Sequence, residues 1–361
     1  MAEPGACLVA TDHLALVVRR GTSQAAIGLE LGATSVHTGW RQPLGGEGRH
    51  AWAGHHIALD VGSLVPLGHD RLFAAGGTSR LELNGLDGTV LDHMEANASP
   101  SAPAGSLGPS AAPAGALGPS TVLVPEGQTV SAYELSPLRR LEQRPTPPGT
   151  WAWAPPRDGY VSVEAESAAN ADADAPPRPD DLPLVWSWHT NAQWRLPRGP
   201  FLRGAPSLSG DLLLVPVGLV ACEGIVALHL PDGDLRWQTT FAPPASPVAR
   251  QRPPLACPLA RLPNGDVVAA TPAPSLHCLD PKTGTPRWQR PLEAEPTVLL
   301  TDDDTLWLGQ AEGRLLVIEA TTGQVVDEAR LAVFAVALVA RRPREIIAVD
   351  RLASVYVCRR A

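Results

Sequence analysis

Few residues of this chain have the types and the spacing that would support catalysis or metal binding. The densest histidine group is His50, His55 and His56. His55 and His56 are neighbours in a predicted strand, so they would point to opposite faces and could not easily share a metal ion. Asp302–Asp304 is an acidic run, but no loop with calcium-binding spacing surrounds it. We therefore expect no metal site in either segment.

Nucleotide and acyl-transfer chemistry also lack their usual sequence signatures. Lys282, the single lysine, follows Pro281 and precedes Thr283, whereas a P-loop needs a Gly-Lys pair followed by Ser or Thr. The segment Gly204–Gly210 has the wrong spacing for a nucleophile elbow. The sequence therefore predicts no catalytic residue and no cofactor-binding residue.

The charge balance limits the classes of partner. The chain has 361 residues, a formal net charge of −8 and a pI near 5.7, so no global field attracts nucleic acid or anionic lipid. The basic clusters Arg139–Arg140 and Arg341–Arg344 are expected to be solvated strand ends. The longest apolar run, Leu331–Ala340, is about half as long as a membrane helix requires. We expect neither a nucleic-acid partner nor a membrane partner.

The cysteines and the N-terminal residues favour a cytoplasmic location. The five cysteines are widely spaced and form no Cys-x-x-Cys pair, which is typical of a reducing compartment; they are Cys7, Cys222, Cys257, Cys278 and Cys358. The first residues, Met1–Cys7, show no basic region followed by an apolar region of the kind found in export signals. We therefore expect free thiols in a cytoplasmic protein.

A repeated hairpin pattern organises the chain around these residues. In Ser275–Gln289 an alternating apolar and polar run breaks at Asp-Pro-Lys-Thr-Gly284 and resumes as an extended run containing Trp288. Further copies surround Gly233 and Gly323, so the turn glycines are 51 and 39 residues apart. This spacing is typical of propeller blades of roughly 40–50 residues. The aromatic residue stands four positions after the turn glycine in two copies, as Trp237 and Trp288, and is replaced by Asp327 in the third.

These residues resemble the quinoprotein-type (pyrroloquinoline-quinone-like) β-propeller repeat, with the approximate consensus Gly-x-Leu-Tyr-Ala-Leu-Asp-x-x-Thr-Gly-x-x-x-Trp. The resemblance covers residues 211–326, about a third of the chain, and specifies fold better than function. It implies that Trp237 and Trp288 dock their blades onto neighbours, with Gly233, Gly284 and Gly323 in the turns. A quinone dehydrogenase of that family would carry adjacent cysteines, which this chain lacks, so we expect no quinone cofactor.

The predicted fold is all-β: one propeller domain over residues 1–361, with seven or eight four-stranded blades. Eight candidate second strands favour eight blades. The last blade lacks an outer strand, and the apolar segment Gly5–Ala10 is predicted to supply it, which would close the ring by pairing the N- and C-terminal strands. Residues 96–120, rich in Ala, Pro, Gly and Ser, are predicted to be a disordered insertion, and residues 165–181 an acidic, proline-rich loop.

Two functional hypotheses follow from this reading. The first is a non-catalytic, cytoplasmic β-propeller that serves as a protein-interaction scaffold. In a narrower form it resembles the propellers that bacterial ternary systems combine with a MoxR-type AAA+ ATPase and a von Willebrand factor A protein. The alternative is an enzyme or small-ligand binder that uses the central channel, and a bound chromophore or metal would favour it.

Overall fold

The computed structural model describes most of the chain as strands joined by turns. The described residues are 6–10, 12–20, 23–32, 35–44, 58–59, 63–68, 70–76, 79–95, 115–118, 121–126, 129–145, 150–152, 160–165, 184–196, 201–202, 207–218, 223–230, 232–241, 259–271, 274–350 and 352–360. Within these ranges every regular element is a β-strand, and none is a helix long and apolar enough to span a membrane.

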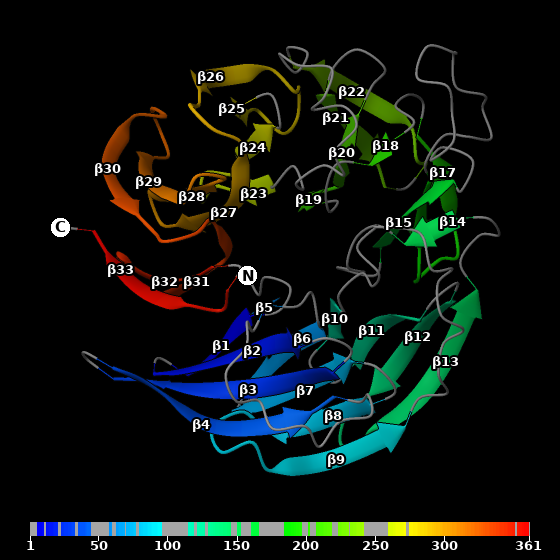
Figure 1. Cartoon of the computed structure of the whole chain (residues 1–361). Helices are drawn as coiled ribbons and strands as arrows, with labels where there is room; N and C mark the ends of the chain where they lie inside the picture. The colour runs from blue at the N-terminus through cyan, green and yellow to red at the C-terminus, as the bar shows by residue number, and fades with distance from the viewer. Residues whose placement is uncertain are drawn as a thin grey trace. The chain divides into compact units, whose positions relative to one another are not determined.

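The chain divides into two compact units, one made of residues 1–145 and 336–361 and the other of residues 146–335. The first unit contains three sheets from the N-terminal part (Figure 1). Sheet A consists of β1 (Ala6–Ala10), β2 (His13–Arg20), β3 (Ser23–Leu31), β4 (Val36–Pro43) and β5 (Ala58–Leu59), which pairs with β2. Sheet B consists of β6 (Ser63–Gly68), β7 (Arg71–Gly76), β8 (Ser79–Asn84) and β9 (Val90–Glu95). Sheet C consists of β10 (Gly115–Gly118), β11 (Thr121–Glu126), β12 (Thr129–Glu134) and β13 (Arg139–Pro145).

Four sheets make up the second unit, and a last sheet is formed by the C-terminal residues. Sheet D consists of β14 (Thr150–Ala152), β15 (Tyr160–Ala165), β16 (Leu184–Ser187) and β17 (Gln193–Arg195). Sheet E consists of β18 (Phe201–Leu202), β19 (Ser207–Ser209), β20 (Leu212–Gly218), β21 (Glu223–His229) and β22 (Leu235–Thr240). Sheet F consists of β23 (Leu259–Arg261), β24 (Val267–Thr271), β25 (Ser275–Leu279) and β26 (Pro286–Pro291). Sheet G consists of β27 (Pro296–Asp302), β28 (Thr305–Gln310), β29 (Arg314–Glu319) and β30 (Val325–Arg330). Sheet H consists of β31 (Ala335–Arg342), β32 (Glu345–Asp350) and β33 (Val355–Arg359).

Burial falls from the second strand of a sheet to its last strand, and the sequence shows why. In sheet G every residue of β28 is buried, which suits a strand covered on both faces. The fourth strand, β30, carries Asp327, Glu328 and Arg330 and is almost entirely exposed. Sheet G is therefore an antiparallel meander whose apolar strands lie inside and whose charged strand lies at the edge.

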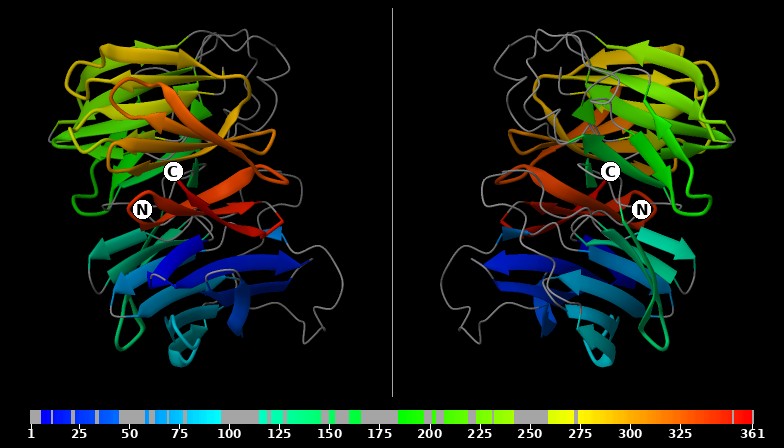
Figure 2. Two further views of the ribbon diagram at one scale, coloured as in Figure 1. Left: turned by 90° about the vertical axis from the view of Figure 1, so that its left-hand side faces the viewer. Right: turned by 90° about the vertical axis from the view of Figure 1, so that its right-hand side faces the viewer.

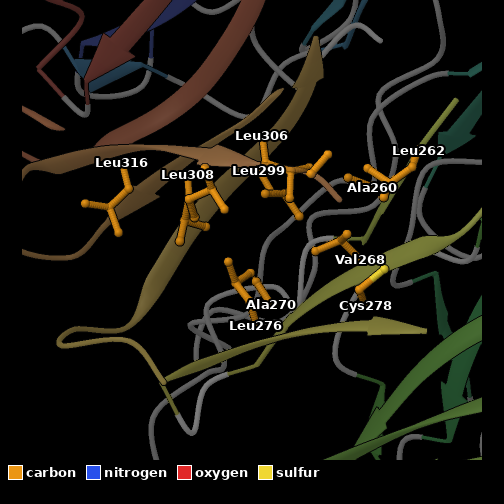
Figure 3. Packing of buried hydrophobic residues seen from close by; sticks show 12 residues of the cluster. Ala260, Leu262, Val268, Ala270, Leu276, Cys278, Leu299, Leu306, Leu308 and Leu316 are labelled. Atoms are coloured by element: carbon orange, nitrogen blue, oxygen red, sulfur yellow. The ribbon is translucent and has the colours of Figure 1, made fainter. Parts of the chain in front are cut away.

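Neighbouring sheets within each unit are joined by apolar clusters. Figure 3 shows one such cluster, between sheets F and G, in which Leu276 and Cys278 of β25 pack with Leu306 and Leu308 of β28. The clusters join A to B and B to C in the first unit, and D to E and E to F in the second. Because each sheet covers the apolar face of the next, no sheet would be stable alone.

The N-terminal strand does not pair where the sequence led us to expect. β1 pairs with β2 through Ala10 and His13, and in the described residues β33 pairs only with β32. A two-residue connection makes the β1–β2 hairpin the pairing with the lowest loop-closure entropy. Sheets A and H instead lie next to each other (Figure 2), and Leu14 and Leu16 belong to one buried apolar cluster with Ile347 and Val349.

The predicted insertions lie mostly outside the described residues. The prediction for residues 96–120 was wrong at its end, because Gly115–Gly118 form β10 and pair with β11. Residues 166–181 of the predicted acidic loop are not described, and its first residue, Ala165, ends β15. The all-β architecture of four-stranded antiparallel sheets confirms the predicted fold class, whereas the number of blades, ring closure and the single domain remain predictions.

Candidate functional site

The repeated tryptophan and glycine meet at the joint between sheets E and F. Trp237, on β22, lies against the turn that joins β25 to β26, and its indole Nε1 donates a hydrogen bond to the Pro281 carbonyl at 2.8 Å. Gly284 of that turn has a φ of +69°, and a Cβ there would lie 2.4 Å from Trp237 Cε3. Thr239 Oγ1 donates to the Gly284 carbonyl at 2.6 Å. The turn thus needs glycine both for its backbone conformation and for the approach of the ring.

The same arrangement recurs at the joint between sheets F and G. Trp288 Nε1 donates to the Ala320 carbonyl at 3.1 Å, and Arg290 donates to the Gly323 carbonyl at 3.0 Å. A Cβ on Gly323, whose φ is +72°, would lie 2.7 Å from the Trp288 ring. The structure therefore brings Trp237 together with Gly284, and Trp288 with Gly323, each pair across two successive sheets.

Two further tryptophans occupy equivalent places that sequence reasoning missed. Trp194 of β17 lies against Gly233, and Trp40 of β4 lies against Gly88 while its Nε1 donates to the Gly85 carbonyl at 2.9 Å. Neither follows a glycine by four residues. For Trp40, the sequence offers one signal, a hydrogen-bond donor two residues after the tryptophan. Gln42 donates to the Gly88 carbonyl, just as Thr239, two residues after Trp237, donates to the Gly284 carbonyl.

A polar pocket of about 450 Å³ opens beside the Trp288 joint. Its charged groups bind one another: Arg287 Nε donates to Asp266 Oδ1, and Arg287 also donates to Asp280 Oδ2, both at 2.8 Å. Asn264 Nδ2 donates to the second oxygen of Asp266 at 3.0 Å. The pKa of Arg287 is raised, chiefly by the hydrogen bond to Asp266. This network connects the residue before β24 and the β25–β26 turn to β26 within sheet F.

The two buried titratable side chains of β25 are both uncharged near pH 7. Burial raises the pKa of Cys278, which lines the pocket, to about 12, so its thiol stays protonated and is a poor nucleophile. His277 is buried with its ring centroid 4.1 Å from that of Phe241, and Ser275 Oγ lies 2.7 Å from its Nε2. Burial lowers the pKa of His277 to about 4, so it is neutral near pH 7.

The remaining groups singled out from the sequence lie apart. His50, His55 and His56 lie outside the described residues. Asp303 and Asp304 form the exposed β27–β28 turn, and Lys282 lies exposed in the β25–β26 turn. Within the part of the chain that the structure describes, no three His, Cys, Asp or Glu side chains are grouped as metal ligands.

Large apolar side chains are exposed on the outer strands of sheets B and C. Leu91 of β9 is 49% exposed and Leu141 of β13 is 48% exposed, and Val90 beside Leu91 is also exposed. Sheets B and C are linked where the Leu138 amide, in the turn before β13, donates to Asp92 Oδ2 of β9 at 2.6 Å. We use the name outer apolar patch for the three exposed residues Val90, Leu91 and Leu141 on the outer strands of these two sheets.

Part of the chain matches a known protein family in sequence. Residues 221–351 match the sequence model of a family described as the outer membrane protein assembly factor BamB. No curated protein matches the chain significantly.

Among solved structures, the computationally designed Ika8 protein has a TM-score of 0.65 at 13% identity, over 99% of this chain and 96% of that one. Sqt1 of Saccharomyces cerevisiae, a WD40-type propeller, has a TM-score of 0.62 at 10% identity, over the whole of both chains. BamB of Moraxella catarrhalis has a TM-score of 0.47 at 12% identity, over 97% of this chain and 82% of that one. The chain has a β-propeller fold, and its residues 221–351 are similar in sequence to the pyrroloquinoline-quinone-like repeats of that family.

Proposed function

We propose that this chain is a non-enzymatic β-propeller that binds other proteins. The observation that carries the proposal is the outer apolar patch, in which Val90, Leu91 and Leu141 face solvent on the outer strands of two sheets joined through Asp92 and Leu138. The outer strands β22 and β30 each expose one large aliphatic side chain, Leu235 and Val326, whereas β9 exposes two in succession, Val90 and Leu91. Covering several exposed aliphatic side chains with a partner removes apolar surface from water at roughly 25 cal/mol per Å².

Two further observations support a binding role. The charged groups of the polar pocket are engaged with one another, and Cys278 within it is protonated, so the pocket offers packing rather than proton transfer. The family whose model matches residues 221–351 is described as an assembly factor, which favours protein partners over a small-molecule substrate.

The finer parts of the proposal concern the compartment and the partners. We propose a cytoplasmic protein, supported by the wide spacing of its five cysteines, of which Cys278 and Cys358 are free thiols in the structure. We also propose that its partners include a MoxR-type AAA+ ATPase and a von Willebrand factor A protein. Fractionation of the native host tests the compartment, and recovery in an envelope fraction would contradict it.

Affinity capture of the full-length tagged protein from its native host tests the function. Wild type is compared with a double variant, Leu91→Asp with Leu141→Asp, and with Leu235→Asp as the matched control, because Leu235 is an exposed leucine on β22. We expect one set of proteins to be captured by wild type and control and lost from the double variant. Mass spectrometry then shows whether an ATPase and a von Willebrand factor A protein are among them. Equal capture by all three, or a stoichiometric chromophore or metal in the purified protein, would contradict the proposal.

A further inference from the structure

Sheet H has three strands, whereas each other sheet of the described chain has at least four. Its fully buried strand β32 matches the second strand of sheet G, β28, so β33 corresponds to the third strand, β29. In sheet G the outer side of β29 pairs with β30. In the described residues the outer side of β33 has no such neighbour (Figure 1).

The register shows which backbone groups of β33 face outward. The Asp350 amide donates to the Ser354 carbonyl at 3.0 Å, and the Arg360 amide donates to the Arg344 carbonyl at 2.9 Å. Hydrogen-bonded pairs alternate along an antiparallel ladder, so Tyr356 and Cys358 lie in hydrogen-bonded pairs with β32. The N–H and C=O groups of the alternate residues, Val355, Val357 and Arg359, therefore point to the open side.

The surroundings of this edge are cationic and partly apolar. The described residues of the segment 335–360 include five arginines against Glu345 and Asp350, a formal charge of +3 in a chain whose total is −8. Arg341 and Arg359 both pair with Glu345, and Arg360 follows the end of β33. Val357 is 39% exposed, and Val36 and Leu352 are exposed as well. Arg341 donates to the Leu31 carbonyl at 3.2 Å, which links sheet H to the end of β3, near Val36.

This charge selects among the possible occupants of the edge. A second copy pairing through its own β33 would bring together two edges of the same net positive charge, and like charges on an edge are a common protection against that kind of pairing. An extended segment rich in Asp and Glu would instead gain attraction from the arginines and hydrogen bonds from the open backbone groups.

We infer that the open edge of β33 binds an extended, acidic segment of a partner protein as the fourth strand of sheet H. The inference rests on the proposed protein-binding function and assigns one binding site and one ligand chemistry to it. The outward N–H of Val357 donates to the bound segment, and alternate apolar side chains of that segment cover Val357.

Binding of synthetic peptides to the full-length protein tests the inference. The probe is a fluorescent nine-residue peptide of alternating Val and Glu, and its controls are the same peptide with Lys in place of Glu and a backbone N-methylated form. We expect the acidic peptide to bind with an affinity that falls as salt rises. Neither control is expected to bind. Hydrogen exchange should slow at Val357 and Arg359 when the acidic peptide is present.

Val357→Pro is the decisive variant because it removes an N–H that points away from β32 and leaves the ladder to β32 intact. Val357→Thr is the matched control because it keeps the N–H and the β-branched shape. We expect Val357→Pro to weaken binding of the acidic peptide by at least about tenfold. A tenfold change in affinity corresponds to ~1.4 kcal/mol, which is the loss expected for one hydrogen bond. Val357→Thr should bind like wild type, and both variants should keep the wild-type melting temperature within a few degrees.

Several outcomes would overturn the inference. They are equal binding of the acidic and Lys peptides, unchanged binding by Val357→Pro, absence of slowed exchange on β33, and dimerisation of the free protein that depends on Val357. The proposed function fails separately, because the outer apolar patch lies on β9 and β13. If capture of native partners still depends on Leu91 and Leu141 while no peptide binds β33, only the assignment of this edge is wrong.

Discussion

Two joints, one between sheets E and F and one between sheets B and C, use different side chains. Both side chains stand at the equivalent position of the outer strand. Trp237 pairs with Ala227 across β21 and β22, and Asp92 pairs with Glu82 across β8 and β9, each just after a bulge. Trp237 donates a hydrogen bond to the next turn, at the Pro281 carbonyl. Asp92 accepts one from the next turn, at the Leu138 amide.

The difference shows what a joint requires. The turn of sheet F presents a carbonyl and has glycine in the left-handed conformation, so a flat ring with one N–H fits it. The turn of sheet C presents amides and has Ser136 at a φ of 57°, and the buried carboxylate of Glu82 accepts hydrogen bonds from the Ser136 amide and hydroxyl. A joint therefore needs a partner for the orphan backbone groups of the turn, and either an aromatic or an acidic side chain can supply it.

Removing the ring from the aromatic joint should have the largest effect on stability. Trp237→Ala deletes a buried ring and leaves the Pro281 carbonyl without its donor, so we expect a loss of about 3–5 kcal/mol in the free energy of unfolding. Trp288→Ala should cost less because that ring is only partly buried. Urea unfolding measures both, with Leu235→Ala on the same strand as Trp237 as an exposed control. A loss for Trp237→Ala no larger than for this control would show that the ring does not hold the joint.

Replacing glycine by alanine in the turn that Trp237 contacts can separate two roles of glycine. These roles are the left-handed backbone conformation and the close approach of the tryptophan ring. Gly284 and Gly210 both have positive φ, 69° and 63°, but a Cβ on Gly210 would have no atom within 4 Å. We expect Gly210→Ala to cost about 1 kcal/mol for backbone strain alone. Gly284→Ala should cost about 1–3 kcal/mol more, because its Cβ would overlap the Trp237 ring. Equal losses in urea unfolding would mean that the ring moves aside freely.

The aromatic joint was predictable from sequence because its pattern repeats locally. Turn residues, glycine and tryptophan within nine positions specified the hairpin around Trp288, and the resemblance supplied its docking role. The polar joint was not predictable, because Glu82 finds Ser136 only after 54 residues of chain. Trp40 and Trp194 were missed for another reason, because neither follows a turn glycine by four residues and the local pattern is therefore absent.

The placement of the N-terminal strand shows the opposite error. The prediction favoured a long-range pairing that would complete the last sheet, although the local hairpin with β2 was available two residues away. Loop-closure entropy decided between them.

Acid should weaken the aromatic joint through His277, which stacks on Phe241 between sheets E and F. Its pKa is lowered to about 4 by burial, so the unfolded chain takes up a proton at higher pH than the folded protein does. This contribution to stability is complete above about pH 6.5 and is lost as the pH falls toward 4, with a total of about 3 kcal/mol. His277→Gln removes the titration. The difference in unfolding free energy between wild type and His277→Gln should therefore change over this interval, and a constant difference would contradict the assignment.

The polar joint should respond to substitution less than the aromatic joint does. Asp92→Ala leaves the Leu138 amide without its acceptor, and a buried donor without a partner costs about 1–3 kcal/mol. Asp92→Asn keeps an oxygen at the same position, so we expect it to lose less than about 1 kcal/mol. Urea unfolding of the three proteins measures these losses, and hydrogen exchange at Leu138 reports the joint directly. If Asp92→Asn were as damaging as Asp92→Ala, the charge of the carboxylate would matter more than its acceptor. In that case the two joints would differ in electrostatics and not only in which group donates.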